Sequence, residues 1–323
     1  MRIVFAGSGT FGLPTLRALV EGGQEIILAV TQPDRPAGRG RAVHAGQVKR
    51  FAADEGIRLL QPEDINARGP VRSIRAVAPD LLLVIAFGQK ISPSLIGAPR
   101  YGAVNLHASL LPKYRGAAPI NWAIIRGEAE TGLTVIEITD RMDAGDILGQ
   151  RATPIGPDET AGELHDRLAL LGARLVTEVV RELALDEVGR RHQNEAQVKI
   201  APRLKKTDGL VDWNQPADDV HNLIRGTTPW PGAYTWWRRK AGREPLRLIL
   251  AKTRLLEGAA SGGGPGTVLA AGREGVDVAA ARGAVRILSL TPAGKRTMSA
   301  ADFVNGYAIE PGARFASARE GAS

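Results

Sequence analysis

Short apolar runs alternate with amphipathic stretches through the first half of the chain. Two of the amphipathic stretches, Leu13–Val20 and residues 46–54, are predicted to be helices. The apolar runs are predicted to be strands, at Arg2–Ala6, Glu25–Thr31, Ile57–Leu60, Leu81–Ala86, Ala103–His107 and Leu133–Thr139. Strands that alternate with helices in this way indicate an α/β fold, with a mostly parallel sheet covered by helices on both faces.

The segment Thr160–Leu183 carries the strongest helical pattern. Thr160 and Glu163 have the spacing of a capping box at a helix start. Five apolar residues follow at helical spacing on one face, namely Leu164, Leu168, Leu171, Leu175 and Val179. We therefore predict a helix that packs against the rest of its domain and carries no site.

The pattern changes after this helix. Residues 186–207 are polar and basic and are predicted to form a linker. From Gly209 onward, glycine-rich turns separate short strands, predicted at Leu246–Ala251, Thr267–Ala270, Val276–Ala280 and Val285–Leu290. Short strands with frequent turns indicate a small β-barrel or sandwich, and a chain of 323 residues has room for two domains.

Composition and charge narrow the classes of protein. The absence of cysteine excludes disulfides, cysteine-rich zinc sites, iron–sulfur clusters and thiol nucleophiles. Met1–Phe5 leads directly into a strand and no apolar run reaches membrane-spanning length, so we expect a cytoplasmic protein with no membrane partner.

The net charge of +8 is distributed unevenly along the chain, with +1 in residues 1–184, +3 in 185–207 and +4 in 208–323. This excess favours a polyanionic partner bound by the later segments, although solubility alone also explains such a charge.

The segment Gly7–Gly12 matches the G-x-G-x-x-G fingerprint of dinucleotide-binding domains. An oxidoreductase that uses NAD(P) is therefore one hypothesis. An acidic residue near the end of the second strand normally completes this fingerprint, but Asp34 lies beyond the strand on a loop bracketed by Pro33 and Pro36. We favour the alternative that the glycines only allow the strand to turn tightly into the helix.

Asn105 and His107 are two residues apart on a predicted strand, so their side chains project from the same face near its carboxyl end. Ligands of open α/β sheets collect at such ends. Asp143 follows the next predicted strand in an acidic turn, and a carboxylate beside an imidazole can orient it and tune its proton affinity. The alternative is a buried, hydrogen-bonded pair with no catalytic role.

These residues lack a serine or cysteine nucleophile but suit direct acyl transfer to an amine. The Asn105 amide can donate to the oxyanion that develops, and such a donor contributes about 10²–10³ in rate. The His107 imidazole can accept the proton that leaves the amine, a contribution of about 10²–10⁴. The five histidines, at positions 44, 107, 165, 192 and 221, show no metal-ligand spacing, so we expect no metal site.

The same residues resemble the motifs of a known family. The Asn105-x-His107 pair, the run Ser109–Pro112 followed by Arg115-Gly116, and the Asp143 turn are similar to those of formyltransferases that use 10-formyltetrahydrofolate. The resemblance implies a Rossmann-like first domain that binds no NAD(P), and 10-formyltetrahydrofolate as the co-substrate. It also implies three groups of site residues: Asn105, His107 and Asp143 as catalytic; Ser109, Leu110, Leu111 and Pro112 at the folate site; and Arg115 and Gly116 as substrate-positioning.

The loop Thr31–Gly40 is similar to the insertion loop of the branch of this family that formylates methionyl-tRNA. Its prolines stiffen the base, its glycines free the tip, and Arg35, Arg39 and Arg41 can contact phosphates. The resemblance implies that Arg39 is the principal arginine at the acceptor stem. A solvated surface loop is the alternative.

The later segments Gly209–Trp213, Ile224–Gly226, Pro229–Ala233 and Pro292–Arg296 resemble the C-terminal domain of the same branch. The resemblance implies a small OB-like β-barrel domain that holds tRNA. The candidate tRNA contacts are Lys205, Lys206, Arg238, Arg239 and Lys240. The neighbouring Trp236 and Trp237 could stack on bases, or one of them could belong to the core while the basic residues are merely solvated.

The combined interpretation is a monomeric, bacterial cytoplasmic enzyme of translation initiation. We expect a catalytic domain at 1–189, a basic linker at 190–207, an OB-like tRNA-binding domain at 208–316 and a frayed tail at 317–323. The expected reaction transfers the formyl group of 10-formyltetrahydrofolate to the amino group of methionine on initiator Met-tRNA. Alternatives are a nucleotide-linked amino sugar or glycinamide ribotide as the acceptor, or a tRNA-binding protein with an idle site.

Overall fold

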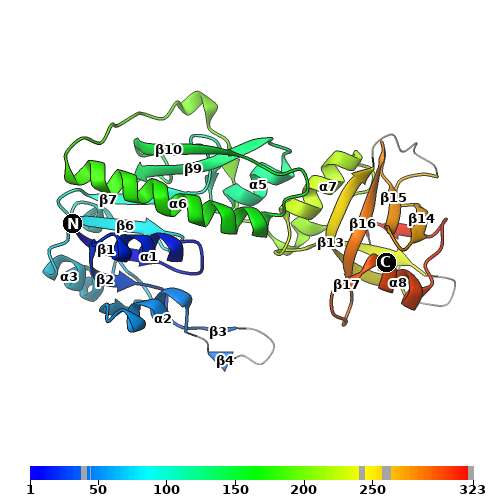
Figure 1. Cartoon of the computed structure of the whole chain (residues 1–323), viewed down its shortest axis with the longest axis horizontal. Coiled ribbons are helices and arrows are strands. Elements are labelled where there is room, and N and C mark those ends of the chain that lie inside the picture. Colours follow the sequence, from blue (N-terminus) through cyan, green and yellow to red (C-terminus); the bar gives the residue numbers. More distant parts are fainter. Residues whose placement is uncertain (38–41, 44, 240–243, 257–262, 319–323) are drawn as a thin grey trace. The chain divides into compact units, whose positions relative to one another are not determined.

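The structure is a computed structural model that describes residues 1–37, 42–43, 45–239, 244–256 and 263–318 (Figure 1). The chain forms two compact units. The first comprises Met1–Pro119, Thr131–Thr153 and His165–Ala201, and the second comprises Ile120–Glu130, Pro154–Leu164 and Pro202–Ser323. Two short stretches, 120–130 and 154–164, therefore pack with the C-terminal part although they lie between segments of the first unit in sequence.

The first unit is built on a seven-stranded sheet with the order β10-β9-β7-β6-β1-β2-β5. Its strands are β1 (Arg2–Gly7), β2 (Glu25–Val30), β5 (Leu59–Leu60), β6 (Leu81–Ile85), β7 (Ala103–His107), β9 (Glu130–Glu137) and β10 (Ile147–Pro154). The five strands from β7 to β5 in this order pair in parallel, and β9 is antiparallel to β7. The prediction of a mostly parallel sheet is confirmed.

The central strand β6 is continuously apolar, as expected for a strand with both faces buried. Every residue of β6 is buried, as in a parallel sheet that is covered on both sides. The chain runs outward from β1 to β2 and β5, then returns to the opposite side of β1 to form β6 and β7. This reversal creates a switch point at the carboxyl ends of the strands, where ligands of such sheets bind.

The helix α6 (Ala161–Ala184) confirms the helix predicted at Thr160–Leu183. The Thr160 hydroxyl accepts a hydrogen bond from the Glu163 N–H at 3.3 Å, and the Glu163 carboxylate accepts one from the Thr160 N–H at 2.8 Å. The bond from the Thr160 N–H to the carboxylate, and a second one that the Thr160 hydroxyl donates to it at 2.8 Å, lower the pKa of Glu163. The apolar stripe is buried at Leu164, Leu168, Leu175 and Val179, which confirms a packing helix.

The helices along the first two-thirds of the chain are α1 (Leu13–Glu21), α2 (Gln47–Asp54), α3 (Arg68–Ala76), α4 (Pro93–Ile96), α5 (Pro119–Ile125) and α6 (Ala161–Ala184). The predicted insertion loop contains the two-residue strands β3 (Pro36–Ala37) and β4 (Ala42–Val43), which pair antiparallel. No helix in the described part of the chain is long and apolar enough to cross a membrane.

The second unit is built on an antiparallel sheet with the order β14-β15-β16-β13-β12-β18, and β17 pairs with β16. Its strands are β12 (Ala233–Arg238), β13 (Leu246–Leu256), β14 (Val268–Gly272), β15 (Gly275–Ala279), β16 (Ala284–Pro292), β17 (Met298–Ser299) and β18 (Arg314–Ala316). The helices α7 (Ala217–Gly226) and α8 (Ala300–Tyr307) pack against this sheet. A small β domain is therefore confirmed, and β13 extends to Leu256 instead of ending at Ala251.

The two adjacent tryptophans of β12 differ in burial because alternate residues of a strand face opposite sides. Trp237 is 7% exposed, and its ring centroid lies 5.6 Å from that of Phe303 on α8. Trp236 is only half-buried. The alternative that one tryptophan belongs to the core is therefore correct for Trp237.

Much of the predicted linker is hydrogen-bonded to the first unit. Its short elements are η1 (Glu195–Gln197), β11 (Ile200–Ala201) and η2 (Lys206–Gly209). Arg191 exchanges backbone hydrogen bonds with Ile147 at 2.9 and 3.0 Å, and β11 pairs in parallel with β8 (Arg115–Gly116). We refer to residues 191–201 as the strap, because they run across the segments that surround Asp143.

Candidate active site

Asn105 and His107 project from the same face of β7, at the carboxyl end of a strand that lies between β6 and β9. His107 is 6% exposed. Asn105 is half-buried, and its amide makes no hydrogen bond to any residue that the structure describes. An amide without a partner beside a nearly buried imidazole is available to a ligand at this edge of the sheet.

The two ring nitrogens of His107 have different surroundings. Nε2 lies 2.9 Å from the backbone carbonyl oxygen of Tyr114. Because a carbonyl can only accept, Nε2 carries the proton of this hydrogen bond. Nδ1 lies 3.7 Å from Oδ2 of Asp143. This is beyond direct hydrogen-bond distance, but it is close enough for the carboxylate to stabilise a positive charge on the ring. Nδ1 is therefore the nitrogen at which the neutral ring can accept a proton.

Asp143 lies in the turn between β9 and β10, in a left-handed conformation with φ of +51°. Aspartate tolerates this region better than most residues. The Asp143 carboxylate accepts a hydrogen bond from the Gly116 N–H at 2.8 Å. The structure thus brings Asp143 together with His107 and Gly116, which precede it by 36 and 27 positions.

The run Ser109–Pro112 forms a loop whose side chains divide between interior and surface. The Ser109 hydroxyl is buried and donates to the Lys113 carbonyl oxygen at 2.6 Å. Leu111 is 2% exposed and belongs to a small core cluster. Leu110 and Pro112 are half-buried. Of the four predicted folate contacts, Leu110 and Pro112 therefore have partly exposed side chains, whereas those of Ser109 and Leu111 are buried.

Arg115 is 6% exposed and its guanidinium is engaged within the chain. It donates to the amide oxygen of Gln193 at 3.1 and 2.8 Å and to the carboxylate of Glu195 at 3.2 and 2.9 Å. The hydrogen bond from Arg115, assisted by Arg141, lowers the pKa of Glu195. Arg115 therefore contacts the strap, and any positioning role toward a substrate is indirect.

The glycines of the dinucleotide-like fingerprint are explained by local packing. A β-carbon on Gly7 would lie 2.6 Å from the Phe5 ring, and one on Gly12 would lie 3.0 Å from the same ring. Gly9 has a φ of +75°, which suits the turn from β1 into α1. Asp34, the acidic candidate for ribose, instead pairs with Lys49 on α2.

The predicted tRNA contacts that the structure describes lie at or near the surface. Arg35 forms an exposed ion pair with Glu63 at 3.2 Å. Arg238 is exposed, and Arg239 donates to the Glu244 carbonyl oxygen at 2.8 and 2.6 Å. Lys205 and Lys206 are also exposed. Arg39, Arg41 and Lys240 lie outside the described residues.

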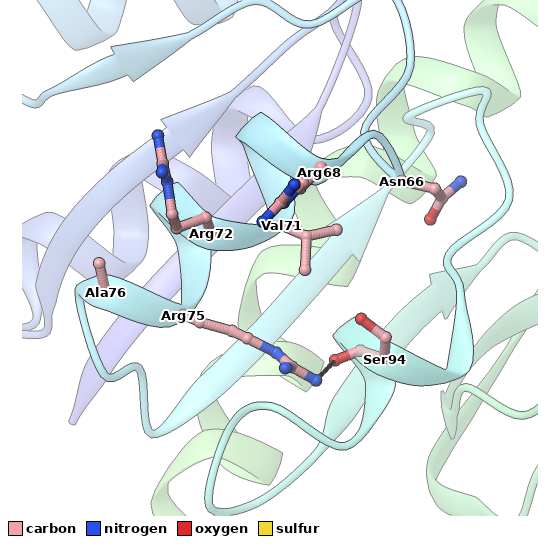
Figure 2. A pocket seen from close by; sticks show the side chains of 7 residues that line it. All are labelled: Asn66, Arg68, Val71, Arg72, Arg75, Ala76 and Ser94. Atoms are coloured by element: carbon pink, nitrogen blue, oxygen red, sulfur yellow. Dashed lines mark hydrogen bonds between the residues drawn. The ribbon is translucent and has the colours of Figure 1, made fainter.

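A surface depression of about 650 Å³ lies beside α3 and the start of α4 (Figure 2). Its lining residues are Asn66, Arg68, Val71, Arg72, Arg75, Ala76 and Ser94. Figure 2 shows Arg75 reaching the Ser94 carbonyl oxygen, at 3.0 Å. No predicted site residue lines this depression, so we assign it no role in catalysis.

Three residues that contact the site were not anticipated from the sequence. Tyr114 orients His107 through its carbonyl, and Gln193 and Glu195 contact Arg115. Tyr114 and the strap residues carry no motif that would mark these contacts. Among the described residues, no group of three or more His, Asp or Glu side chains has the arrangement of a metal site.

Comparison with known proteins identifies similar families for both units. The formyl transferase family model matches residues 1–180, and the model of the formyl transferase C-terminal domain matches residues 203–308. The methionyl-tRNA formyltransferase of Geobacter metallireducens is 46% identical over 314 residues, which cover 97% of this chain and 98% of that protein. The enzyme of the same name from Moorella thermoacetica is 43% identical over 312 residues, covering 97% and 98%.

Solved structures share the fold at low sequence identity. The sugar 3N-formyl transferase WlaRD, determined in the presence of dTDP and 5-N-formyl-THF, has a TM-score of 0.67 at 17% identity, covering 92% of this chain and 99% of that one. HypX from Aquifex aeolicus in complex with tetrahydrofolic acid has a TM-score of 0.61 at 19% identity, covering 95% and 47%. These likenesses support the fold, and the site chemistry depends on the residues described above.

Proposed function

Because the chain belongs to the formyl transferase family and matches its methionyl-tRNA formyltransferases over nearly its whole length, we propose that it formylates initiator Met-tRNA. The formyl group of 10-formyltetrahydrofolate passes to the α-amino group of the esterified methionine. The product, N-formylmethionyl-tRNA, serves translation initiation. The observation that carries this proposal is the cluster of Asn105, His107 and Asp143 in a chain so similar to these enzymes.

The reaction needs no covalent enzyme intermediate. The neutral amine attacks the formyl carbon, the new C–N bond forms, and the carbonyl oxygen takes up the electron pair. The unpartnered amide of Asn105 is suited to donate to this oxyanion, because its N–H groups make no competing hydrogen bond within the described chain. The bond between the formyl carbon and N10 then breaks, and N10 takes up a proton to release tetrahydrofolate.

The proton moves between the amine and N10, and His107 is its carrier in this proposal. Nε2 already donates to Tyr114, so the proton from the attacking amine is accepted at Nδ1, directly or through one water. The Asp143 carboxylate at 3.7 Å stabilises the imidazolium that forms. The same proton is returned to N10 when the intermediate collapses.

The remaining assignments follow the same proposal. We assign catalysis to residues 1–189, with Leu110 and Pro112 reaching folate by their side chains and Ser109 and Leu111 shaping the loop. We assign tRNA binding to the insertion loop, to Lys205 and Lys206 of the basic linker at 190–207, and to an OB-like domain at 208–316. The proposed contacts are Arg35, Arg39, Arg41, Lys205, Lys206, Arg238, Arg239 and Lys240. A monomer in the bacterial cytoplasm suits this role.

The test is a formylation assay with 10-formyltetrahydrofolate and two acceptors, methionyl-initiator tRNA and methionyl-elongator tRNA. We expect strong preference for the initiator. His107→Gln should lower the rate by about 10²–10⁴ while circular dichroism shows an intact fold. A nucleotide-linked amino sugar and glycinamide ribotide complete the acceptor panel. Formylation of either small molecule without formylation of Met-tRNA would overturn the proposal.

A further inference from the structure

Gln193 makes four hydrogen bonds at the edge of the candidate active site. Its Oε1 accepts from Nε and Nη2 of Arg115 at 3.1 and 2.8 Å. Its Nε2 donates to the backbone carbonyl oxygens of Asp143 and Gly145, each at 2.8 Å. Because a guanidinium can only donate and a carbonyl can only accept, these partners fix the orientation of the amide.

These bonds close a ring around Asp143. The carboxylate of Asp143 is held by the N–H of Gly116, and its carbonyl oxygen is held by Gln193. Gln193 is in turn held by Arg115, the residue that precedes Gly116. The dipeptide Arg115-Gly116 therefore holds Asp143 in two ways. Gly116 binds its carboxylate directly, and Arg115 holds its main chain through Gln193.

The turn needs this support because of its backbone conformation. Asp143 has a φ of +51°, which L-residues other than glycine rarely adopt. Return to an ordinary φ would swing the carboxylate away from Nδ1 of His107. The amide of Gln193 bridges the carbonyls on either side of Ala144 and so opposes that rotation.

The other side of Arg115 is fixed as well. Glu195 accepts from both terminal nitrogens of Arg115, and it also accepts from Arg141 of the same turn at 3.0 Å. Arg115 is nearly buried, so its guanidinium cannot exchange these partners for water without rearrangement. Gln193 is consequently held in a defined place on the strap.

We propose that Gln193 is a positioning residue for formyl transfer, which holds Asp143 in the conformation that keeps its carboxylate beside His107. The inference rests on the proposed function. Gln193 is a neutral residue of the strap and contacts neither a substrate nor the imidazole. It acts on the reaction only through the position of Asp143. Its loss should therefore affect the chemical step and leave substrate binding nearly unchanged.

The test compares Gln193→Met with Gln197→Met, the same substitution four residues along the strap. Within the described residues, the Gln197 side chain makes no hydrogen bond. We expect Q193M to lower kcat by about tenfold to a hundredfold, because a displaced catalytic group loses rate steeply. Its KM for both substrates should stay within about twofold, and Q197M should match the wild type.

A double-mutant cycle separates positioning from a general loss of stability. If Gln193 acts through Asp143, Q193M should change kcat less than about twofold when added to Asp143→Asn. Gln193→Glu is the second variant, because it keeps the acceptor for Arg115 and replaces only the donors to the turn. We expect Q193E to lose at least as much kcat as Q193M.

Three outcomes would overturn the inference: wild-type kcat in both Q193M and Q193E, a loss expressed only in KM, or a full additive loss on the D143N background. Each of these presupposes a wild-type enzyme that formylates Met-tRNA. A wild-type enzyme with no such activity would instead contradict the proposed function, so the two failures are distinguishable.

Discussion

The backbone N–H of Gly116 donates to a carboxylate oxygen of Asp143 at 2.8 Å, across 27 positions of sequence. Only glycine fits at this position. Its φ is +124°, which residues with a β-carbon rarely adopt, and a β-carbon would lie 2.6 Å from the Ala201 carbonyl oxygen. Gly116→Ala should force β8 and β11 apart. We expect urea unfolding to show a free energy of unfolding that is lower by about 1–3 kcal/mol. Steady-state kinetics should show a lower kcat with little change in KM.

Gly189→Ala is the matched control for this prediction. A β-carbon on Gly189 would meet no atom within 4 Å. Its unfolding free energy should stay within about 0.5 kcal/mol of the wild type, and its kcat should not change. Equal stability of the two alanine variants would contradict the close approach of Gly116 to Ala201.

The strongly periodic elements could be predicted from the sequence, because the spacing of apolar residues within each element shows which of its faces is buried. The strand Ala103–His107 has the predicted bounds, and α6 differs from its prediction by one residue at each end. The short helices α7 and α8 were not predicted. They cover the β-sheet of the second unit, and this tertiary contact, more than a long apolar stripe, stabilises them.

The candidate site could be predicted only as far as its side chains carry the chemistry. Asn105 and His107 share a face by strand spacing, and Asp143 was marked by its turn and by the family resemblance. Tyr114 and Gly145 contribute backbone carbonyls, which every residue possesses, so nothing in the sequence distinguishes them. The partners of Arg115 on the strap lie 78 and 80 positions away, beyond the reach of any local pattern.

Within the part of the chain that the structure describes, the Asn105 amide has no hydrogen-bond partner, and this leads to a second prediction. Asn105→Asp preserves size but places a carboxylate where the oxyanion develops. We expect it to lower the single-turnover rate of formyl transfer by about 10²–10³ or more, a larger loss than that of Asn105→Ala, which admits water.

The control for Asn105→Asp is the same isosteric change at Asn194. Asn194 is exposed and caps η1 by accepting from the Ala196 N–H at 3.1 Å, a role that aspartate fills equally well. Asn194→Asp should retain the wild-type rate within about twofold. If Asn105→Asp were as active as this control, Asn105 would have no part in stabilising the oxyanion.

His221 makes the stability of the second unit depend on pH. It is 2% exposed on α7, with Nδ1 2.9 Å from the Thr253 hydroxyl and Nε2 3.0 Å from the Pro157 carbonyl oxygen. Burial lowers the pKa of His221 and outweighs the nearby Asp158 carboxylate. The neutral ring suits both partners, since Nε2 donates to the carbonyl while Nδ1 accepts from the hydroxyl.

The direction of the pH effect follows from this lowered pKa. The unfolded chain binds a proton at His221 below about pH 6.5, whereas the folded chain does not until the pH reaches the lower folded-state pKa. Stability is therefore retained above about pH 6.5 and lost as the pH falls from there toward the folded-state pKa. Each unit of pKa difference corresponds to about 1.4 kcal/mol.

Urea unfolding of the wild type and of His221→Gln between about pH 5.5 and 7.5 measures this effect. Glutamine does not titrate, so the wild type should lose its stability advantage over the variant as the pH falls. A difference in unfolding free energy that stays constant across this range would show that His221 is protonated equally in both states.

Lys49 on α2 fixes the root of the predicted tRNA-binding loop. It pairs with the carboxylate of Asp34, which also accepts from Nε2 of Gln61 at 3.1 Å, and these bonds lower the pKa of Asp34. Gln61 further holds the Gln32 carbonyl oxygen at 3.0 Å. The stretch from Gln32 to Asp34 therefore starts the loop from a defined position.

We expect Lys49→Met to raise KM for Met-tRNA by roughly fivefold, equivalent to about 1 kcal/mol of ordering, while kcat and the KM for 10-formyltetrahydrofolate stay unchanged. Loss of a positive charge also weakens tRNA binding by itself. Lys90→Met, at an exposed position after β6, removes the same charge and should raise this KM by less than about twofold. Steady-state kinetics with each substrate varied in turn measures both variants. If KM for Met-tRNA rose equally in Lys49→Met and Lys90→Met, the loss of charge alone would explain the effect. The start of the loop would then have no role in tRNA binding.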